Sequence, residues 1–198
     1  MSLIPMRCLQ PAMFAATARL VSRPAGRAAG ARIAASPKPN FEQRRFLKTE
    51  TAPVLYSAHA KVKGARTGHV EGDDLKVDLT MAKALGGAGD KGKTNPEELL
   101  AAGYGACFQA AMNAVAATMK GVRMPTDNPD DSVVDATVHL VGDLKSLDLG
   151  LRLDLRISVR GVEKDVLDRI VSKAFEVCPF SRAVEGNVVT NFEVVVME

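Results

Sequence analysis

Apolar residues recur along this chain in two periods, and each period predicts a different kind of element. Apolar positions on every second residue are typical of strands with one buried face, and an apolar stripe at helical spacing is typical of a packed helix. Strands are expected over residues 54–63, 75–81, 133–142, 147–160 and 187–197, and helices over 95–119 and 163–177. This order, in which strands and helices do not alternate regularly, favours an α+β fold over a wound parallel sheet.

The start of the first helix has the strongest local signal in the chain. Asn95 is a good N-cap, Pro96 suits the first helical position, and Glu98 follows three residues after the cap. Thr94 and Glu97 have the overlapping capping-box spacing. One broad face of this helix carries small residues, which allow another helix or a sheet to approach closely: Ala102, Gly103, Ala106, Cys107, Ala110, Ala111 and Ala114.

Charge separates the N-terminal segment from the rest of the chain. Residues 1–41 hold six of the 26 basic residues and none of the 23 acidic ones, amid much alanine. This composition is typical of a mitochondrial presequence, so we expect 1–45 to be a removed targeting segment and 46–198 to be one domain in the mitochondrial matrix. A disordered basic arm for nucleic acid or anionic membrane is the alternative. The apolar runs of this segment are too short for a membrane span.

The rest of the chain has slightly more acidic than basic residues, because 20 basic residues remain against 23 acidic ones. Basic and acidic residues are interspersed there, and no aromatic ladder accompanies them, so no nucleic-acid partner is expected. The three histidines share no ligand spacing, and four-ligand zinc spacing is absent, so no metal site is expected either.

The sequence has three cysteines, of which Cys8 lies in the expected presequence. Two remaining cysteines are too few for a secreted disulfide framework. Cys107 lies inside the first helix and Cys178 at the end of the second, so the two thiols can face each other across a helix contact. A redox pair is the sharper interpretation. The plainer one is that each is a small buried hydrophobic residue.

Two stretches carry a resemblance to a known family. Residues 85–108, which read LGGAGDKGKTNPEELLAAGYGACF, and the later Cys-Pro-Phe-Ser at 178–181 resemble the organic hydroperoxide resistance (Ohr) branch of the OsmC/Ohr family. The similarity extends from about residue 54 to 196. One departure is Gly64-Ala-Arg66, where that branch more often reads Gly-Gly-Arg. The resemblance implies an OsmC/Ohr-like fold, with antiparallel sheets packed around two long central helices, and an intertwined homodimer with two interfacial active sites.

The resemblance also implies roles for four residues. Cys107 matches the peroxidatic cysteine, Cys178 the resolving cysteine, Arg66 the residue that stabilises the thiolate and polarises the peroxide, and Glu97 the acid that orients this arginine. Taken alone, Arg66 reads as a solvated turn residue. Cys107 nevertheless needs a cation, because only the thiolate attacks a peroxide well and a mid-helix position lies far from the positive helix end.

The position of Glu97 restricts the geometry of this site. Ten residues separate it from Cys107, a rise of about 15 Å in one straight helix. A partner subunit could contribute Glu97, Arg66 could bridge a longer gap, or Glu97 could only favour the helix dipole. The first interpretation agrees with the dimer that the resemblance implies.

The expected function is a thiol peroxidase that reduces organic hydroperoxides, including those of fatty acids, to alcohols through a sulfenic acid and a Cys107–Cys178 disulfide. The resemblance implies recycling by an external dithiol such as a dihydrolipoyl group on a lipoylated protein, with no bound cofactor. Candidate pocket residues, each also a plausible core residue, are Leu85, Leu100, Tyr104, Phe108, Met112 and Phe180. The alternatives are a non-enzymatic redox sensor, an OsmC-branch peroxidase, and a structural protein with two inert thiols.

Overall fold

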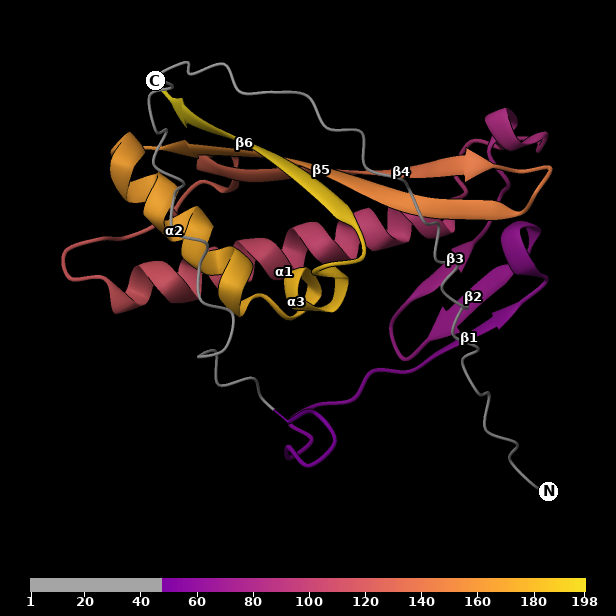
Figure 1. The fold of residues 1–198 in the computed structure, drawn as a ribbon, viewed down its shortest axis with the longest axis horizontal. Coiled ribbons are helices and arrows are strands. Elements are labelled where there is room, and N and C mark those ends of the chain that lie inside the picture. The colour runs from indigo at the N-terminus through magenta and orange to yellow at the C-terminus, as the bar shows by residue number, and fades with distance from the viewer. Residues whose placement is uncertain (1–47) are drawn as a thin grey trace, which may run out of the picture. The chain divides into compact units, whose positions relative to one another are not determined.

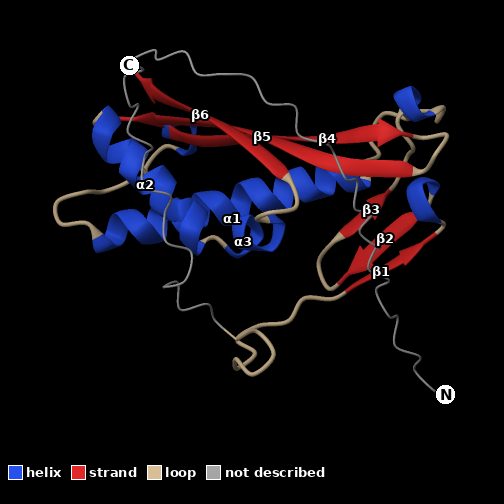
Figure 2. Cartoon of the chain, viewed as in Figure 1, coloured by secondary structure: helices blue, strands red, loops and turns tan. Residues whose placement is uncertain are grey.

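A computed structural model describes residues 48–198. The chain divides into two units, Met1–Pro53 and Val54–Glu198. The expected presequence, residues 1–45, lies outside the described residues. The second unit has two three-stranded sheets and three α-helices, which confirms the α+β class (Figures 1 and 2).

The smaller sheet precedes the long helix and is antiparallel throughout. Its strands, in the order β1-β2-β3, are β1 (Ala60–Lys63), β2 (His69–Gly72) and β3 (Lys76–Asp78). The turn between the first two strands forms a short 3₁₀ helix, η2 (Ala65–Thr67), entered through Gly64 at φ 76°. The left-handed conformation favours glycine at this position. The hairpin therefore presents Arg66 at its tip.

In this region one strand prediction needs correction, and one strand was not predicted. The strand expected over residues 54–63 begins only at Ala60, and the large side chains before it are exposed, Leu55 to 93% and Tyr56 to 83%. Alternating apolar residues predict a surface that can be covered, but nothing in the described part of a single chain covers this one. Strand β2 was not predicted, because it is four residues long and includes Glu71 and Gly72, which interrupt any apolar pattern.

The long helix α1 (Pro96–Thr118) forms where the capping signal predicts it. The Asn95 side chain accepts a hydrogen bond from the backbone N–H of Glu98 at 2.8 Å. Thr94, however, donates to the Glu98 carboxylate at 2.6 Å instead of forming a capping box with Glu97. Glu97 is thereby left available for a different partner. Another short 3₁₀ helix, η3 (Lys83–Leu85), lies in the glycine-rich connection before α1.

The larger sheet follows α1, in the strand order β4-β5-β6. After η4 (Pro129–Asp131) come β4 (Ser132–Asp143) and β5 (Asp148–Arg160), which pair antiparallel, and the last strand is β6 (Val189–Met197). Strand β6 runs parallel to β5, which corrects the expectation of purely antiparallel sheets. A parallel neighbour needs a crossover connection. Here the crossover consists of α2 (Lys164–Val177) and the short helix α3 (Pro179–Val184), which was not predicted.

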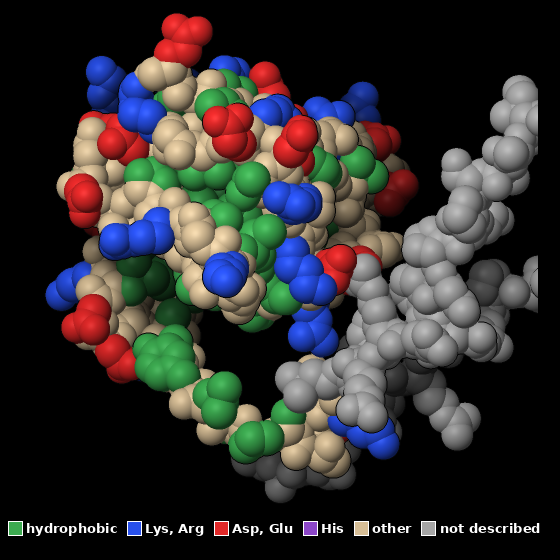
Figure 3. Space-filling view, turned by 90° about the vertical axis from the view of Figure 1, so that its left-hand side faces the viewer, with side chains coloured by type: hydrophobic (Ala, Val, Ile, Leu, Met, Phe, Trp, Pro, Cys, Tyr) green, Lys and Arg blue, Asp and Glu red, His purple; other side chains and the backbone are tan. Residues whose placement is uncertain are grey.

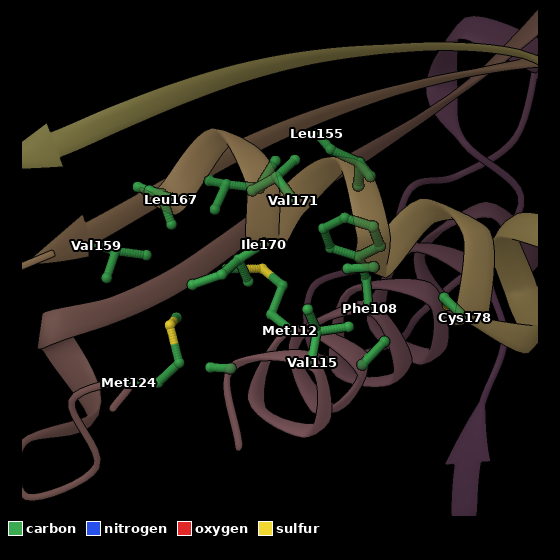
Figure 4. Packing of buried hydrophobic residues seen from close by; sticks show 14 of the residues in the cluster. Phe108, Met112, Val115, Met124, Leu155, Val159, Leu167, Ile170, Val171 and Cys178 are labelled. Carbon is green, nitrogen blue, oxygen red and sulfur yellow. The ribbon is translucent and has the colours of Figure 1, made fainter. Parts of the chain in front are cut away.

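The core lies between the larger sheet and the helices beneath it (Figures 1 and 4). Alternate residues of β5 point inward and are almost fully buried: Leu153, Leu155, Ile157 and Val159. They meet one face of α2, which buries Leu167, Ile170, Val171 and Ala174 completely. Burying a side chain of this size contributes about 1.5–3 kcal/mol relative to leaving it exposed. These contacts fix α2 and hold its C-terminal end against α1.

The opposite face of α1 is exposed in a single chain. Its residues there are small and mostly apolar: Ala102, Ala106, Ala110, Asn113, Ala114 and Ala117. By length and composition α1 could cross a membrane, and it is the one helix of the described residues that could. It is also the central helix of the folded unit, packed on β4 and α2. On the face shown in Figure 3, side chains of both charge signs are interspersed with exposed hydrophobic ones.

Candidate active site

The two cysteines predicted to form a redox pair do lie together. Cys107 is in the middle of α1, and Cys178 occupies the junction between α2 and α3. Their Sγ atoms are 3.6 Å apart, and both thiols are free. Cys178 is fully buried at the end of the core, beyond Phe108 in Figure 4, whereas Cys107 is partly exposed. An oxidant from solution therefore meets Cys107 first.

The local sequence explains where Cys178 lies. Pro179 cannot continue the hydrogen-bonding pattern of α2, so the chain leaves the helix at Cys178 and starts α3 one residue later. The Cys178 backbone N–H still donates to the Ala174 carbonyl at 2.8 Å. This bond keeps the thiol in register with the buried face of α2 and aims it at α1.

The electrostatic environment of Cys107 within one chain disfavours its thiolate. Burial raises the pKa of the Cys107 thiol above its ordinary value, while a hydrogen bond from the backbone N–H of Phe180 acts in the opposite direction. No cation among the described residues of the same chain offsets the effect of burial. The nucleophile that a peroxidase needs is therefore incompletely stabilised in a single copy.

Arg66 and Glu97, the other two predicted site residues, form a two-pronged ion pair. The Arg66 guanidinium donates to the Glu97 carboxylate oxygens at 2.9 and 2.6 Å. This hydrogen bonding lowers the pKa of the Glu97 carboxyl below its ordinary value of 4.5 and raises the pKa of Arg66. Both side chains are partly shielded from solvent, Glu97 with 17% of its side chain exposed. Arg66 is thus a paired residue, not a solvated turn residue.

The structure brings the four residues together as two pairs and not as one cluster. Helix α1 is continuous from Pro96 to Thr118, so Glu97 and Cys107 are separated by about 15 Å of helical rise. Both terminal nitrogens of Arg66 donate to Glu97. The Arg66 guanidinium therefore lies near Glu97, at the opposite end of this helical segment from Cys107. A single chain therefore has the thiol pair in one place and the cation in another.

The candidate pocket residues separate by burial. Tyr104, Phe108 and Met112 are fully buried and belong to the core, as their plainer interpretation predicted. Phe180 is 38% exposed and packs edge-on against the Tyr104 ring, with centroids 6.2 Å apart. Leu100 in the second turn of α1 and Leu85 in η3 are partly buried. Of the six, Phe180 is the most exposed, and it follows Cys178 by two residues.

One polar contact near the thiols was missed from the sequence. The Tyr104 hydroxyl and the Ser181 hydroxyl are hydrogen-bonded at 2.9 Å, and both residues are buried. Burial raises the pKa of the Tyr104 phenol, which keeps it protonated. Ser181 belongs to the Cys-Pro-Phe-Ser motif, but no spacing rule predicts the short helix α3 that turns this serine toward α1.

Two of the three histidines in the described region form separate pairs with carboxylates. His69 lies 2.7 Å from Asp78, and His139 lies 2.9 Å from Asp154. Within residues 48–198, no group of three or more His, Cys, Asp or Glu side chains could hold a metal ion.

Fold and thiol pair together define the class of protein. The chain belongs to the OsmC/Ohr family: the model of the family described as OsmC-like protein matches residues 87–193. Relatives named organic hydroperoxide resistance protein extend the likeness over nearly their whole length. The one from Xanthomonas axonopodis pv. citri is 44% identical over 137 residues, which cover 68% of this chain and 91% of the relative. OhrA of Bacillus subtilis is 35% identical over 142 residues, which cover 71% of this chain and 96% of OhrA.

Solved structures agree with these sequence relatives. An organic hydroperoxide resistance protein OsmC from Legionella pneumophila superposes with a TM-score of 0.64 at 38% identity, covering 73% of this chain and all of that one. OhrB of Bacillus subtilis superposes with a TM-score of 0.61 at 33% identity, covering 71% of this chain and 99% of OhrB. The fold is therefore that of the Ohr proteins, and the relatives support a role in resistance to organic hydroperoxides.

Proposed function

We propose that this chain is a thiol peroxidase that reduces organic hydroperoxides to alcohols, with Cys107 as the peroxidatic and Cys178 as the resolving cysteine. The observation that carries the proposal is the facing thiol pair, 3.6 Å between Sγ atoms, with one thiol reachable from solvent and the other buried. The names of the relatives supply the substrate class.

The reaction balances as one two-electron oxidation by the peroxide, one condensation without net oxidation, and one two-electron reduction. The Cys107 thiolate attacks the distal peroxide oxygen, so that an S–O bond forms, the O–O bond breaks, and the alkoxide takes a proton to leave as an alcohol. Cys178 then attacks the sulfenic sulfur, so that an S–S bond forms and the S–O bond breaks with release of water. An external dithiol returns two electrons by thiol–disulfide exchange and restores both thiols.

The missing cation is supplied by a second copy of the chain. Glu97 and Cys107 lie five residues on either side of Ala102, an exposed small residue of α1. Two α1 helices paired antiparallel about a twofold axis at Ala102 bring the partner's Glu97, with the arginine it holds, level with Cys107. The arginine then favours the thiolate and lowers the pKa that burial raises. This arrangement makes the protein a homodimer with two interfacial sites, around two central α1 helices.

Substrate and reductant follow from the surroundings of the thiols. The exposed Phe180 ring, two residues after Cys178, favours an apolar peroxide, such as a fatty-acid hydroperoxide, over hydrogen peroxide. For the reductant we propose a dihydrolipoyl group on a lipoylated protein. The acid-free basic segment, residues 1–41, supports delivery to the mitochondrial matrix, where such proteins occur. No bound cofactor takes part in this scheme.

The test is a thiol count in a Cys8→Ser background, before and after one equivalent of cumene hydroperoxide. The parent protein should lose both thiols within seconds, and the alcohol should appear in equal amount. The Cys107→Ser variant should keep its remaining thiol, and Cys178→Ser should stop at a sulfenic acid that dimedone traps. Retention of both thiols in the parent would mean that the pair is structural. Oxidation without turnover, when a lipoyl dithiol is supplied, would indicate a redox sensor.

A further inference from the structure

The start of α3 fixes the place of one member of the thiol pair. Cys178 stands immediately before this helix, and its Sγ atom lies 3.6 Å from that of Cys107. Any movement of α3 relative to α1 therefore changes the distance between the sulfurs. The position of α3 is a property of the reaction site.

Helix α3 cannot hold that position by itself. It has six residues, and no side chain caps its N-terminal end. An isolated helix of this length is unstable in water, because too few hydrogen bonds offset the cost of nucleation. Its place must come from contacts with the neighbouring helices.

The hydrogen bond between Tyr104 and Ser181 is the polar contact that ties α3 to α1. Tyr104 precedes Cys107 by three residues, and Ser181 follows Cys178 by three, so this bond spans the same two segments as the sulfur pair, about one turn away. Both residues are almost completely buried, Tyr104 at 0% and Ser181 at 6% exposure. A buried hydroxyl pair has no water to replace a lost partner, so breaking it is costly.

Ring contacts near this bond reinforce the same junction. The Phe180 ring stands edge-on to Tyr104, with ring centroids 6.2 Å apart. These contacts are non-directional, whereas the hydroxyl pair fixes the distance between two defined atoms. The hydroxyl pair is therefore the contact that can set the register of α3 on α1.

We propose that Tyr104 and Ser181 are positioning residues for the resolving step: their hydrogen bond holds α3 so that Cys178 faces Cys107 and the disulfide closes rapidly. This inference rests on the proposed peroxidase function. In the resolving step the two sulfurs approach from 3.6 Å to a bond of about 2.05 Å, while the S–O bond breaks and water leaves. A fixed α3 leaves only this short movement to be made.

The experiment separates formation of the sulfenic acid from closure of the disulfide, in the full chain carrying Cys8→Ser. Rapid mixing with cumene hydroperoxide is followed by quenching with dimedone for the sulfenic acid and with a thiol reagent for the disulfide. Ser181→Ala should slow disulfide closure about tenfold, the effect of roughly one buried hydrogen bond, so that sulfenic acid accumulates. At a pH where Cys107 is fully ionised, the first step should stay within about twofold of the parent.

Two further variants make the result specific. Tyr104→Phe should slow closure by a similar factor, and adding it to Ser181→Ala should cause little further change, because both remove the same bond. Ser181→Thr keeps the hydroxyl and should restore most of the rate. Ser132→Ala is the matched control, because Ser132 is equally buried and its hydroxyl has no partner.

The outcomes distinguish this inference from the function on which it rests. If the parent forms neither sulfenic acid nor disulfide, the peroxidase function itself fails. If the parent reacts and Ser181→Ala closes its disulfide at the parent rate, or if Ser132→Ala slows closure equally, the positioning role is wrong. Circular dichroism of each variant excludes unfolding as the cause, and a slowing confined to the second step, with rescue by threonine, supports the role.

Discussion

Glu97 has two effects that a single position in the sequence could not reveal together. It lies in the first turn of α1, where a carboxylate is favourable to the helix dipole, and it also accepts two hydrogen bonds from Arg66. The ion pair fixes the hairpin tip of the smaller sheet to the beginning of the helix. Because the Arg66 side chain is still 36% exposed, water screens the pair and its contribution to stability is modest.

The Glu97→Gln substitution tests this pair through pH. Hydrogen bonding to Arg66 lowers the folded-state pKa of Glu97, so the unfolded chain binds more protons as the pH falls below 4.5. The stability from this pair is therefore complete above pH 4.5 and is lost as the pH falls through the lowered folded-state pKa. We expect Glu97→Gln to lose up to about 1 kcal/mol at pH 7 and to approach the parent in acid.

Urea denaturation of both proteins at pH 7 and at successively lower pH measures this difference. Glu98→Gln is the matched control, because that neighbouring carboxylate accepts from Thr94 and not from an arginine. A destabilisation by Glu97→Gln that is the same at every pH would show that the loss does not come from its titration.

The facing of the two thiols could be predicted from the sequence, whereas the buried Tyr104–Ser181 contact beside them could not. Cys107 and Cys178 could be singled out because two thiols on helices are rare and chemically distinctive. The Tyr104–Ser181 bond joins residues 77 positions apart through a short helix that has no periodicity of its own. The pairing of Arg66 with Glu97 was expected from the family resemblance and not from local pattern. The sequence neighbourhood of Arg66 indicates a turn, and only the folded hairpin brings the side chain to Glu97.

At the scale of elements, predictions held where apolar periodicity and capping agreed. Helix α1 begins at the predicted cap, and β4 and β5 lie within a residue or so of their expected bounds. Where the signal was short or one-sided, it failed. Residues 54–59 alternate without forming a strand, and the parallel direction of β6 depends on a crossover that local pattern cannot encode.

Two glycines show how packing decides the effect of the same substitution. A Cβ atom at Gly105, inside α1, would contact Ala136 and Val134 at an ordinary 3.6 Å. Gly105→Ala should therefore gain up to about 1 kcal/mol from helix propensity. At Gly68, a Cβ atom would lie 1.7 Å from the Lys63 carbonyl oxygen, which no rearrangement of a side chain can relieve.

Gly68→Ala should consequently destabilise the hairpin that carries Arg66, by several kcal/mol or to the point of local unfolding. Thermal unfolding at fixed protein concentration measures both variants, and a higher midpoint for Gly105→Ala with a lower one for Gly68→Ala is the expected result. If Gly105→Ala unfolds earlier than the parent, α1 and β4 are packed more tightly than these distances indicate.

The molecule as a whole leaves one large feature unexplained by a single copy. The central helix exposes a face of small, mostly apolar residues along most of its length, and Cys107 borders this face without a cation. In the proposed dimer, pairing α1 with its own symmetry mate covers the face and completes the site together. Neither effect could be predicted from a local window of sequence, because both depend on a second chain.

A cysteine placed on the proposed twofold axis tests this pairing. In a background with Cys8, Cys107 and Cys178 replaced by serine, Ala102→Cys should form an intermolecular disulfide under mild oxidation, since a residue on the axis faces its own copy. Non-reducing electrophoresis should show most of the chain as a covalent dimer. Ala117→Cys, on the same exposed face but fifteen residues from the axis, is the control and should remain monomeric in that assay.

Light scattering of the uncrosslinked parent gives an independent measure of the oligomeric state. A monomer at micromolar concentration, or equal crosslinking at both positions, would contradict the antiparallel pairing and the supply of Arg66 by a partner.

The closeness of the two sulfurs also bears on how the protein survives its own substrate. A sulfenic acid that meets a second peroxide molecule is overoxidised to sulfinic acid, which is a dead end for most proteins. A thiol held 3.6 Å away competes as an internal reactant, and well-oriented groups reach effective concentrations on the order of 10⁵ M. No hydroperoxide in solution approaches that figure. In the proposed cycle, the buried cysteine therefore protects the reactive one, because it keeps the sulfur within reversible chemistry when peroxide is abundant.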